Sequence, residues 1–213
     1  MTLTMRIDSV AAKPDRAGRY LIKFDNGSTM RLYRQTVEDY GLYNGRELSQ
    51  EQVAQLRIDA GAMSAKMRAV RIVAASGVSK DDLQHRLVRK GEDPVQAAAA
   101  VEWMADLNLI DDAQTAQQLV SRCAARGYGI SRAKQVLYEK RIPKEYWQDA
   151  LEDYPDQSDH IMTFLRSKLG ADADERQRKR AIDALLRRGH SYSEVRKAMR
   201  QLDFDDFPED YDG

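Results

Sequence analysis

The chain has 213 residues, which is enough for one large or two small domains. Hydrophobic residues make up 42% of it and charged residues 32%, a composition that indicates many exposed helix faces and excludes collagen and a long disordered chain. Its single cysteine, Cys123, excludes an intramolecular disulfide framework and a multi-cysteine metal site. The 34 basic and 34 acidic residues cancel, but six of the acids and none of the bases fall in the last eleven residues, which leaves a modestly basic body.

We expect a cytoplasmic protein with no membrane partner. No apolar segment approaches the roughly 20 residues that a membrane helix needs, and the N-terminal sequence MTLTMRIDSV lacks the apolar region of a signal peptide. The acidic segment 203–213 is predicted to be a disordered tail, and the alternative is that it tunes the binding of a polyanion.

Residues 1–60 are predicted to form a small module with a β-hairpin. Tyr20–Phe24 and Thr29–Tyr33 alternate between apolar and polar residues, and Asn26–Gly27 between them supplies the positive φ angles of a tight turn. A third extended segment is expected at Met5–Ile7 and a short helix at Gln35–Tyr40.

Ser49–Gln52 has the pattern of a capping box, which predicts a helix from there to about residue 60. From residue 62 onward every segment has a helical pattern.

An internal repeat runs through this helical part. Leu87–Gly91, Leu137–Arg141 and Leu185–Gly189 are similar strings that start 50 and then 48 residues apart. In each copy a helix ends with basic residues that suit its C-terminal dipole, and a turn and another amphipathic helix follow. Gly91 and Gly189 stand where a helix end favours a left-handed residue, whereas the second copy has Arg141 there.

Three helix caps are predicted in the repeats. Ser79 opens the middle helix of the first copy, Asp111 the first helix of the second copy, and Ser191 the last helix of the third copy. The predicted fold class is mainly α, with three tandem three-helix repeats behind the N-terminal module. Because a unit of about 45 residues buries too little surface alone, the copies should stack into an elongated, curved body. The predicted divisions are 1–60 for the module, 61–110, 111–155 and 156–202 for the repeats, and 203–213 for the tail.

Enzyme motifs are absent from the sequence. It contains no GxxxxGK phosphate loop, no GxSxG elbow and no HExxH pair. His85, His160 and His190 follow no ligand spacing and are expected at the surface or at boundaries, and Cys123 is expected to be a small buried hydrophobic residue. We therefore expect no catalytic residue, no metal site and no cofactor.

Basic residues carry the strongest functional signal. On a helix over Glu175–Arg188, the apolar residues Ala181, Ile182, Leu185 and Leu186 fall on one side, and Arg176, Lys179, Arg180 and Arg187 fall on the other. Such a stripe suits phosphates or an acidic protein groove, and the alternative is a solvated helix face. The corresponding helix or its ends carry Arg86, Arg89 and Lys90 in the first copy and Arg132, Lys134 and Lys140 in the second.

Arg126–Gly129 is the most distinctive local string. Its two glycines around an aromatic residue predict a tight turn between helices with a packed Tyr128, and Ser131 is predicted to cap the next helix. Arg126 and Arg132 remain candidate ligand contacts.

Three stretches, by their order and spacing along the chain, resemble the RecX family, the small regulatory proteins of the RecA recombinase. They are Ser79–Gly91, then Leu107–Asp112, then Arg126–Arg132 followed by Leu137–Ile142. The resemblance covers about residues 64–202, and 1–60 looks like a hairpin module that some members carry. The chain departs from the family at Arg141, where glycine is usual, and at Ile130, where proline is common.

The resemblance implies a non-enzymatic protein that lies in the groove of the RecA–DNA filament and inhibits its ATPase and strand exchange, and so regulates recombination and the SOS response. Expected partners are the RecA filament and, weakly and without sequence preference, single- and double-stranded DNA, with the chain as a monomer. The alternative is a direct DNA-binding regulator of the helix-turn-helix type, against which stands the lack of a helix rich in base-reading Arg, Asn and Gln. A scaffold without nucleic acid is less favoured because of the basic stripe.

Overall fold

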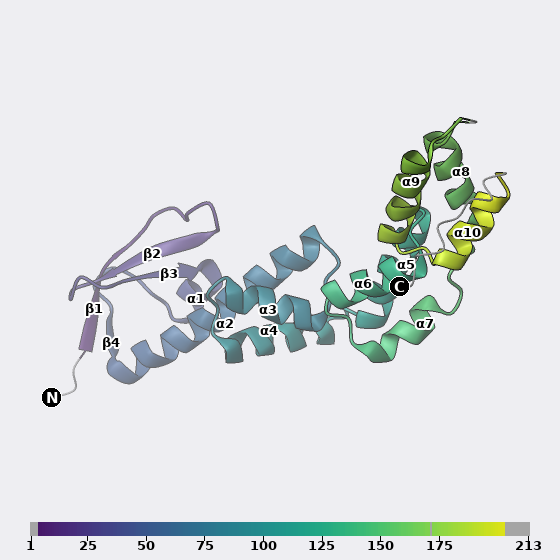
Figure 1. Ribbon diagram of the computed structural model, residues 1–213. Helices are drawn as coiled ribbons and strands as arrows, with labels where there is room; N and C mark the ends of the chain where they lie inside the picture. The colour runs from purple at the N-terminus through teal and green to yellow at the C-terminus, as the bar shows by residue number, and fades with distance from the viewer. Residues whose placement is uncertain (1–3, 171, 203–213) are drawn as a thin grey trace. The chain divides into compact units, whose positions relative to one another are not determined.

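The computed structural model describes residues 4–170 and 172–202, so the predicted acidic tail lies outside the described residues. The chain divides after Ile110 into two compact units. It is mainly helical, with a small sheet near its N-terminus, as Figure 1 shows. No helix in the described part combines the length and the apolar character that crossing a membrane would take.

The described part of the first unit begins with a four-stranded antiparallel sheet. Its strands are β1 (Thr4–Val10), β2 (Arg19–Phe24), β3 (Thr29–Tyr33) and β4 (Glu47–Ser49), in the order β3-β2-β1-β4. The predicted hairpin is confirmed as β2 and β3, with Gly27 at a φ of 80° in the turn between them. The third extended segment predicted at Met5–Ile7 is confirmed within β1, which pairs with β2. The fourth strand was not predicted: β1 pairs on its other side with β4, a strand of three residues that carries no alternating pattern.

The sheet packs against α1 (Arg34–Asp39) and the first part of α2 (Gln50–Ala75). Their shared core holds buried apolar residues from strands and helices, namely Ile7, Ile22, Phe24, Leu32, Leu42, Leu48, Val53 and Leu56. This core fixes the N-terminal end of α2 to the sheet.

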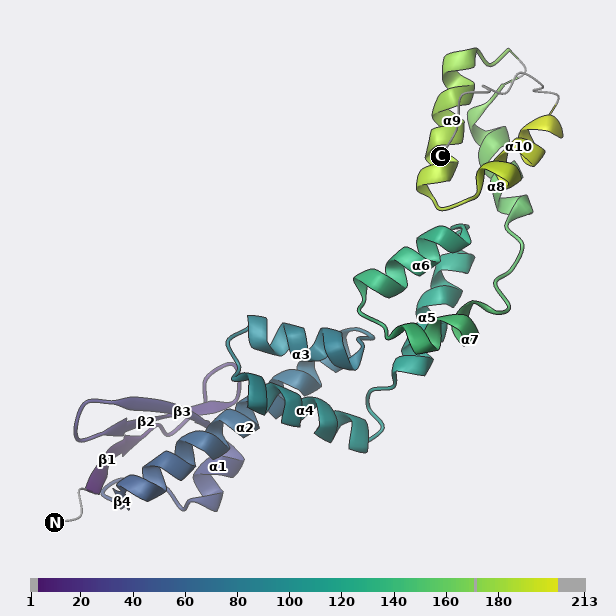
Figure 2. The ribbon, with the colours of Figure 1, turned by 60° about the horizontal axis from the view of Figure 1, so that its bottom comes forward.

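Helix α2 is longer than predicted. Its capping box is confirmed, since Ser49 accepts a hydrogen bond from the N–H of Gln52 and the Gln52 side chain accepts one from the N–H of Ser49. The predicted end near residue 60 is wrong: the helix runs through Gly61 to Ala75 because alanines and other good helix formers follow. The predicted boundary between 60 and 61 therefore falls inside one continuous helix (Figure 2).

The second half of α2 packs with α3 (Lys80–Arg89) and α4 (Pro94–Asp106). Their core is rich in small residues, which permit a close approach of α2 and α4: Ala65, Ala69, Leu83, Leu87, Ala97, Ala100, Val101 and Met104. The predicted cap of α3 is confirmed, with Ser79 Oγ accepting from the N–H of Asp82 at 3.1 Å.

The second unit begins with α5 (Asp112–Ala125), α6 (Ile130–Glu139), the 3-10 helix η1 (Lys144–Tyr146) and α7 (Trp147–Leu151). Ala116, Leu119, Val120, Leu137 and Ile142 form their core. Asp111 caps α5 as predicted. The prediction for Ser131 is wrong, because α6 begins one residue after Gly129 and Ser131 lies inside its first turn.

The chain continues into α8 (Ser158–Lys168), α9 (Glu175–Arg187) and α10 (Tyr192–Arg200). These helices share a core of Ile161, Leu165, Ala181, Ile182, Leu185, Val195, Ala198 and Met199. The predicted cap of α10 is confirmed as a capping box between Ser191 and Glu194. The reading of the helix groups as stacked repeats stays a prediction.

Candidate nucleic-acid interface

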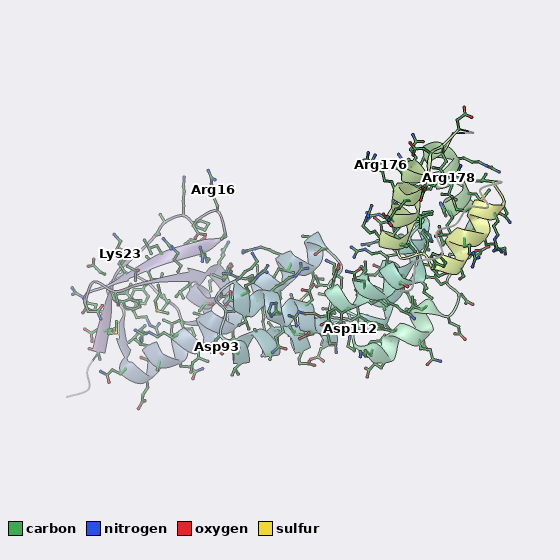
Figure 3. The ribbon with its side chains drawn as sticks, in the orientation of Figure 1. Arg16, Lys23, Asp93, Asp112, Arg176 and Arg178 are labelled. Atoms are coloured by element: carbon green, nitrogen blue, oxygen red, sulfur yellow. The ribbon has the colours of Figure 1, made fainter. Side chains whose placement is uncertain are left out.

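The stripe predicted on α9 has the expected geometry. Arg176, Lys179, Arg180 and Arg187 are all exposed, while Ala181, Ile182 and Leu185 on the opposite face are buried. Figure 3 shows Arg176 on this helix with the other side chains of the unit. The α9 stripe, as we call these four basic residues, is therefore accessible to a partner along its length.

An aromatic ring lies beside the α9 stripe. The guanidinium of Arg188 stands 4.5 Å from the centre of the Phe164 ring, and the ammonium of Lys168 stands 6.0 Å from it. Phe164, Lys168 and Arg180 also line a shallow cavity of about 270 Å³ between α8 and α9. Lys168 and Arg188 thus add to the cationic surface, and neither was a predicted site residue.

The turn after α5 meets the turn after α9 by backbone contacts. The N–H of Gly129 donates to the carbonyl of Arg188 at 2.9 Å, and the N–H of Ser131 donates to the carbonyl of Gly189 at 3.3 Å. A Cβ on Gly129 would lie 2.0 Å from the Gly189 oxygen. The glycines are therefore required for this glycine junction, which joins the α5–α7 helices to the α8–α10 helices.

The glycine junction brings predicted site residues near the end of α9. Arg126 is exposed in the turn, and Arg132 is half-buried and pairs with Glu139 at 3.2 Å. The carbonyl of Tyr128, between the two glycines, accepts a hydrogen bond from the hydroxyl of Tyr154. Farther along α6, Lys134 is exposed, and Lys140, which already has an interaction partner, is half-buried at the helix end.

His190 lies inside the glycine junction, so the expectation that it is a surface or boundary residue is wrong. It is buried, and its Nε2 lies 3.0 Å from the Gly127 carbonyl. Burial lowers the pKa of His190, against the opposing effect of that hydrogen bond. The neutral ring therefore donates to Gly127 and serves packing. His85 and His160 are exposed.

Cys123 is buried, as expected, and burial raises the pKa of its thiol. A thiol with a raised pKa is a poor nucleophile at neutral pH. Among the described residues no group of three or more His, Cys, Asp or Glu side chains is arranged to hold a metal ion.

The first unit contains a groove of about 680 Å³ that gathers basic side chains from three parts of the chain. We call it the basic groove. Its cationic lining consists of Arg19 at the start of β2, Arg68 and Arg71 on α2, and Arg86, Arg89 and Lys90 at the end of α3. Within the described residues, Asp82 is the one carboxylate in the lining, and it pairs with Arg86 at 2.8 Å.

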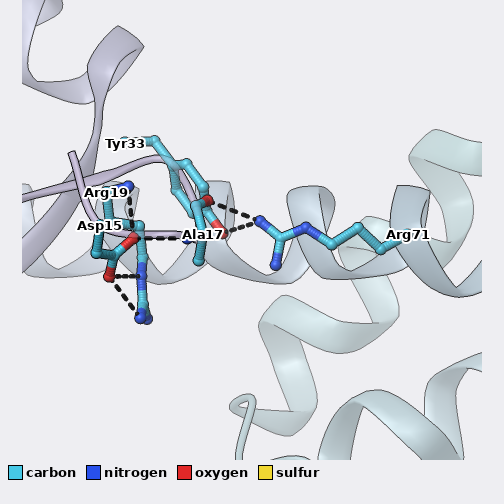
Figure 4. Close-up of polar contacts among 5 residues, drawn as sticks. All are labelled: Asp15, Ala17, Arg19, Tyr33 and Arg71. Carbon is cyan, nitrogen blue, oxygen red and sulfur yellow. Dashed lines mark hydrogen bonds and ion pairs between the residues drawn. The ribbon is translucent and has the colours of Figure 1, made fainter.

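Arg71 attaches the N-terminal module to the groove wall. Its Nη2 donates to the carbonyl of Ala17 at 3.0 Å and to the hydroxyl of Tyr33 at 2.7 Å (Figure 4). Beside it, Asp15 pairs with Arg19 at 2.9 Å, and the backbone N–H of Arg19 is the main cause of the lowered pKa of Asp15. The loop before β2 is thereby held over α2.

Arg68 joins α2 to the end of α3. Its Nε lies 2.6 Å from a carboxylate oxygen of the buried Glu92, and its Nη1 donates to the carbonyl of Lys90 at 3.0 Å. The second contact satisfies one of the carbonyls that a helix end leaves unpaired. Arg68 therefore positions Arg89 and Lys90, both of which are exposed.

Of the basic groove, sequence reasoning found Arg86, Arg89 and Lys90 and missed the rest. Arg68 and Arg71 stand three residues apart and so share a helix face, a signal that was available in the sequence. Arg19 reaches the groove only through the tertiary contacts of the loop. On α10, Arg196, Lys197 and Arg200 form another exposed cluster that was missed, although it has helical spacing.

No family model matches this chain. A regulatory protein RecX of Halorhodospira halophila is 30% identical over 154 residues, which cover 70% of this chain and 95% of that protein. A regulatory protein RecX of Clostridioides difficile is 20% identical over 97% of this chain and 99% of its own. A crystal structure of a regulatory protein RecX covers 93% of this chain at a TM-score of 0.61 and 18% identity, which supports the fold.

The 30% identity and the shared fold define a mainly helical regulatory protein. The chain belongs to the RecX family of regulatory proteins.

Proposed function

We propose that this protein binds the RecA–DNA filament in the cytoplasm and inhibits its ATPase and strand exchange, and that it thereby regulates recombination and the SOS response. It acts as a monomer without catalysis of its own. This is the role that the resemblance to the family implies, and the basic surfaces of the two units would carry the binding.

The exposure of the α9 stripe is the observation that carries the proposal. Its four cations lie opposite a buried apolar face, so they add nothing to the core of their own helix group. Within the same unit, the glycine junction holds Arg126 near the C-terminal end of α9. Such a surface suits the phosphates or acidic protein surfaces of a nucleoprotein filament.

The proposal includes the repeat architecture. The α2–α4, α5–α7 and α8–α10 helices each share a core. In the first and third groups, α3 and α9 have basic residues in their last turn, and a turn follows. We infer that these groups are repeats of one helical unit, each of which would present a basic face to a long partner.

Sedimentation of RecA filaments tests whether the protein binds them. We expect the protein to sediment with RecA assembled on single-stranded DNA in the presence of a non-hydrolysable ATP analogue. The pellet should contain at most one molecule of the protein for several RecA subunits. A control contains the same DNA without RecA, since DNA binding alone is expected to be weak at physiological salt. Recovery in the pellet at equal amounts with and without RecA would favour the alternative of a direct DNA-binding regulator.

A further inference from the structure

The basic groove of the first unit is built jointly by the N-terminal module and by the helices that follow it. The first residue of β2, Arg19, lines the groove, and Arg71 bonds to Ala17 in the loop before β2 and to Tyr33 at the end of β3. Across the groove lie Arg89 and Lys90. We propose that this groove is a binding site for the phosphodiester backbone of DNA and that the N-terminal module completes it.

The charge of the groove favours a polyanionic ligand. Arg86 is paired with Asp82, Arg68 with Glu92 and Arg19 with Asp15. Among the described residues, no carboxylate forms an ion pair with Arg71, Arg89 or Lys90. Uncompensated cations that face one groove repel one another, and a polyanion that enters the groove removes this repulsion.

The cations of the groove are arranged in rows. Arg68 and Arg71 are one turn apart on α2, and Arg86 and Arg89–Lys90 are one turn apart on α3. The groove therefore offers cationic side chains at intervals of about 4.5–6 Å along two walls, which suits a chain of phosphates better than a single anion. Five of the six cationic lining residues in the described chain are arginines, whose planar fork matches a phosphate with two parallel hydrogen bonds.

The small apolar area of the groove favours DNA over an acidic protein. The apolar part of the lining is limited to Ala17, Ile72 and Ala75 with the partly buried ring of Tyr33. Protein partners gain most of their affinity from large apolar or aromatic side chains that enter fitted pockets. A nucleic-acid backbone needs none, because its affinity comes from the release of counterions.

One other explanation for part of the cluster is that Arg86, Arg89 and Lys90 stabilise the C-terminal dipole of α3. That explanation does not cover Arg19 and Arg71, which come from other elements and converge on the same groove. The inference rests on the proposed function for its setting, since the filament presents DNA to a bound regulator.

The test measures the binding of the full chain to a fluorescein-labelled 30-residue oligothymidylate, without RecA, by fluorescence anisotropy over a range of NaCl concentrations. We expect weak binding that falls with salt. The double variant Arg89→Ala/Lys90→Ala should bind roughly tenfold more weakly. Each phosphate contact on a single strand contributes about 0.7 to the magnitude of the slope of log K against log salt, so the loss of two contacts should reduce that magnitude by about 1.4. With a duplex of equal length, the variants should rank in the same order of binding affinity.

The matched control is Lys23→Ala/Arg57→Ala. It also removes two exposed positive charges from the first unit, but neither residue lines the groove. We expect its affinity to stay within about twofold of the parent. Arg19→Ala tests the N-terminal module separately and should lower the slope by about 0.7. Thermal melting of each variant identifies any that fail to fold.

Equal affinity of the groove variant and the control variant would overturn the proposal, as would a parent chain that does not bind the oligonucleotide at low salt. A groove variant that keeps its DNA affinity but no longer inhibits the RecA ATPase would also overturn it, and would assign the groove to an acidic protein surface. The proposed function fails on a different result, namely a parent chain that leaves the RecA ATPase unchanged.

Discussion

Replacing Gly189 with alanine is expected to destabilise the second unit by about 2–5 kcal/mol. The residue has a φ of 85°, where a side chain costs about 1–2 kcal/mol. In addition, a Cβ would lie 2.2 Å from the backbone nitrogen of Arg132, so two backbone segments must separate, and overpacking of this kind costs about 1–3 kcal/mol more. Thermal melting with hydrogen exchange at the Gly129 and Ser131 amides, which donate across the glycine junction, measures both effects.

Gly91→Ala is the matched control for the backbone strain. Gly91 has a φ of 89° at the corresponding turn after α3, and a Cβ there meets no atom within 4 Å. Its substitution should cost only the about 1–2 kcal/mol of the left-handed conformation. If Gly189→Ala melts no lower than Gly91→Ala, the close approach of the turns contributes nothing to stability and the glycine junction does not exist in solution.

Replacing the α9 stripe with alanine should weaken binding to the RecA–DNA filament by about a hundredfold. Each exposed charge contributes about 0.5–1 kcal/mol to such a contact at moderate salt. The quadruple variant Arg176→Ala/Lys179→Ala/Arg180→Ala/Arg187→Ala should fold normally, because alanine favours helix and the opposite face carries the core. Filament affinity is measured beside the melting temperature.

Two comparisons make this result interpretable. A quadruple alanine variant of Lys13, Lys23, Arg31 and Arg57 removes as many exposed charges outside the α9 stripe and should bind nearly as the parent does. Leu185→Ala should behave in the opposite way, since removal of this buried side chain costs about 2–4 kcal/mol and reduces activity only as the protein unfolds. An α9-stripe variant that melts and binds like the parent would show a merely solvated helix face, with the contact surface elsewhere, around Arg126 and Arg132.

Features with a local cause could be predicted from the sequence. The caps at Ser49, Ser79, Asp111 and Ser191 depend on side chains within three residues of the helix start, and each is present. The β2–β3 hairpin follows from its turn residues in the same way. The faces of α9 follow from a period of 3.6 residues and nothing else.

Errors and omissions arose where distant segments decide the structure. The tight turn predicted at Arg126–Gly129 is present between α5 and α6, but the sequence did not show that Gly129 also contacts Gly189, 60 residues farther along the chain. His190 is buried because Gly127 meets it there. Strand β4 exists because β1 offers it an edge.

The basic groove shows the same limit at the candidate site. Its α3 residues stand out in the sequence because they recur in the other repeat strings. Arg19, at the start of β2, joins them only because Arg71 bonds to Ala17 before β2 and to Tyr33 in β3. No spacing rule connects these residues, so the groove could be found only in three dimensions.

Titration of RecA with the full chain during ATP hydrolysis on single-stranded DNA tests the central claim most directly. The proposed function predicts that the rate of hydrolysis falls at sub-stoichiometric or near-stoichiometric ratios of the protein to RecA. The chain alone should hydrolyse no ATP, as a sequence without a GxxxxGK loop implies. A RecA rate that stays unchanged over a wide excess of the protein would contradict the account.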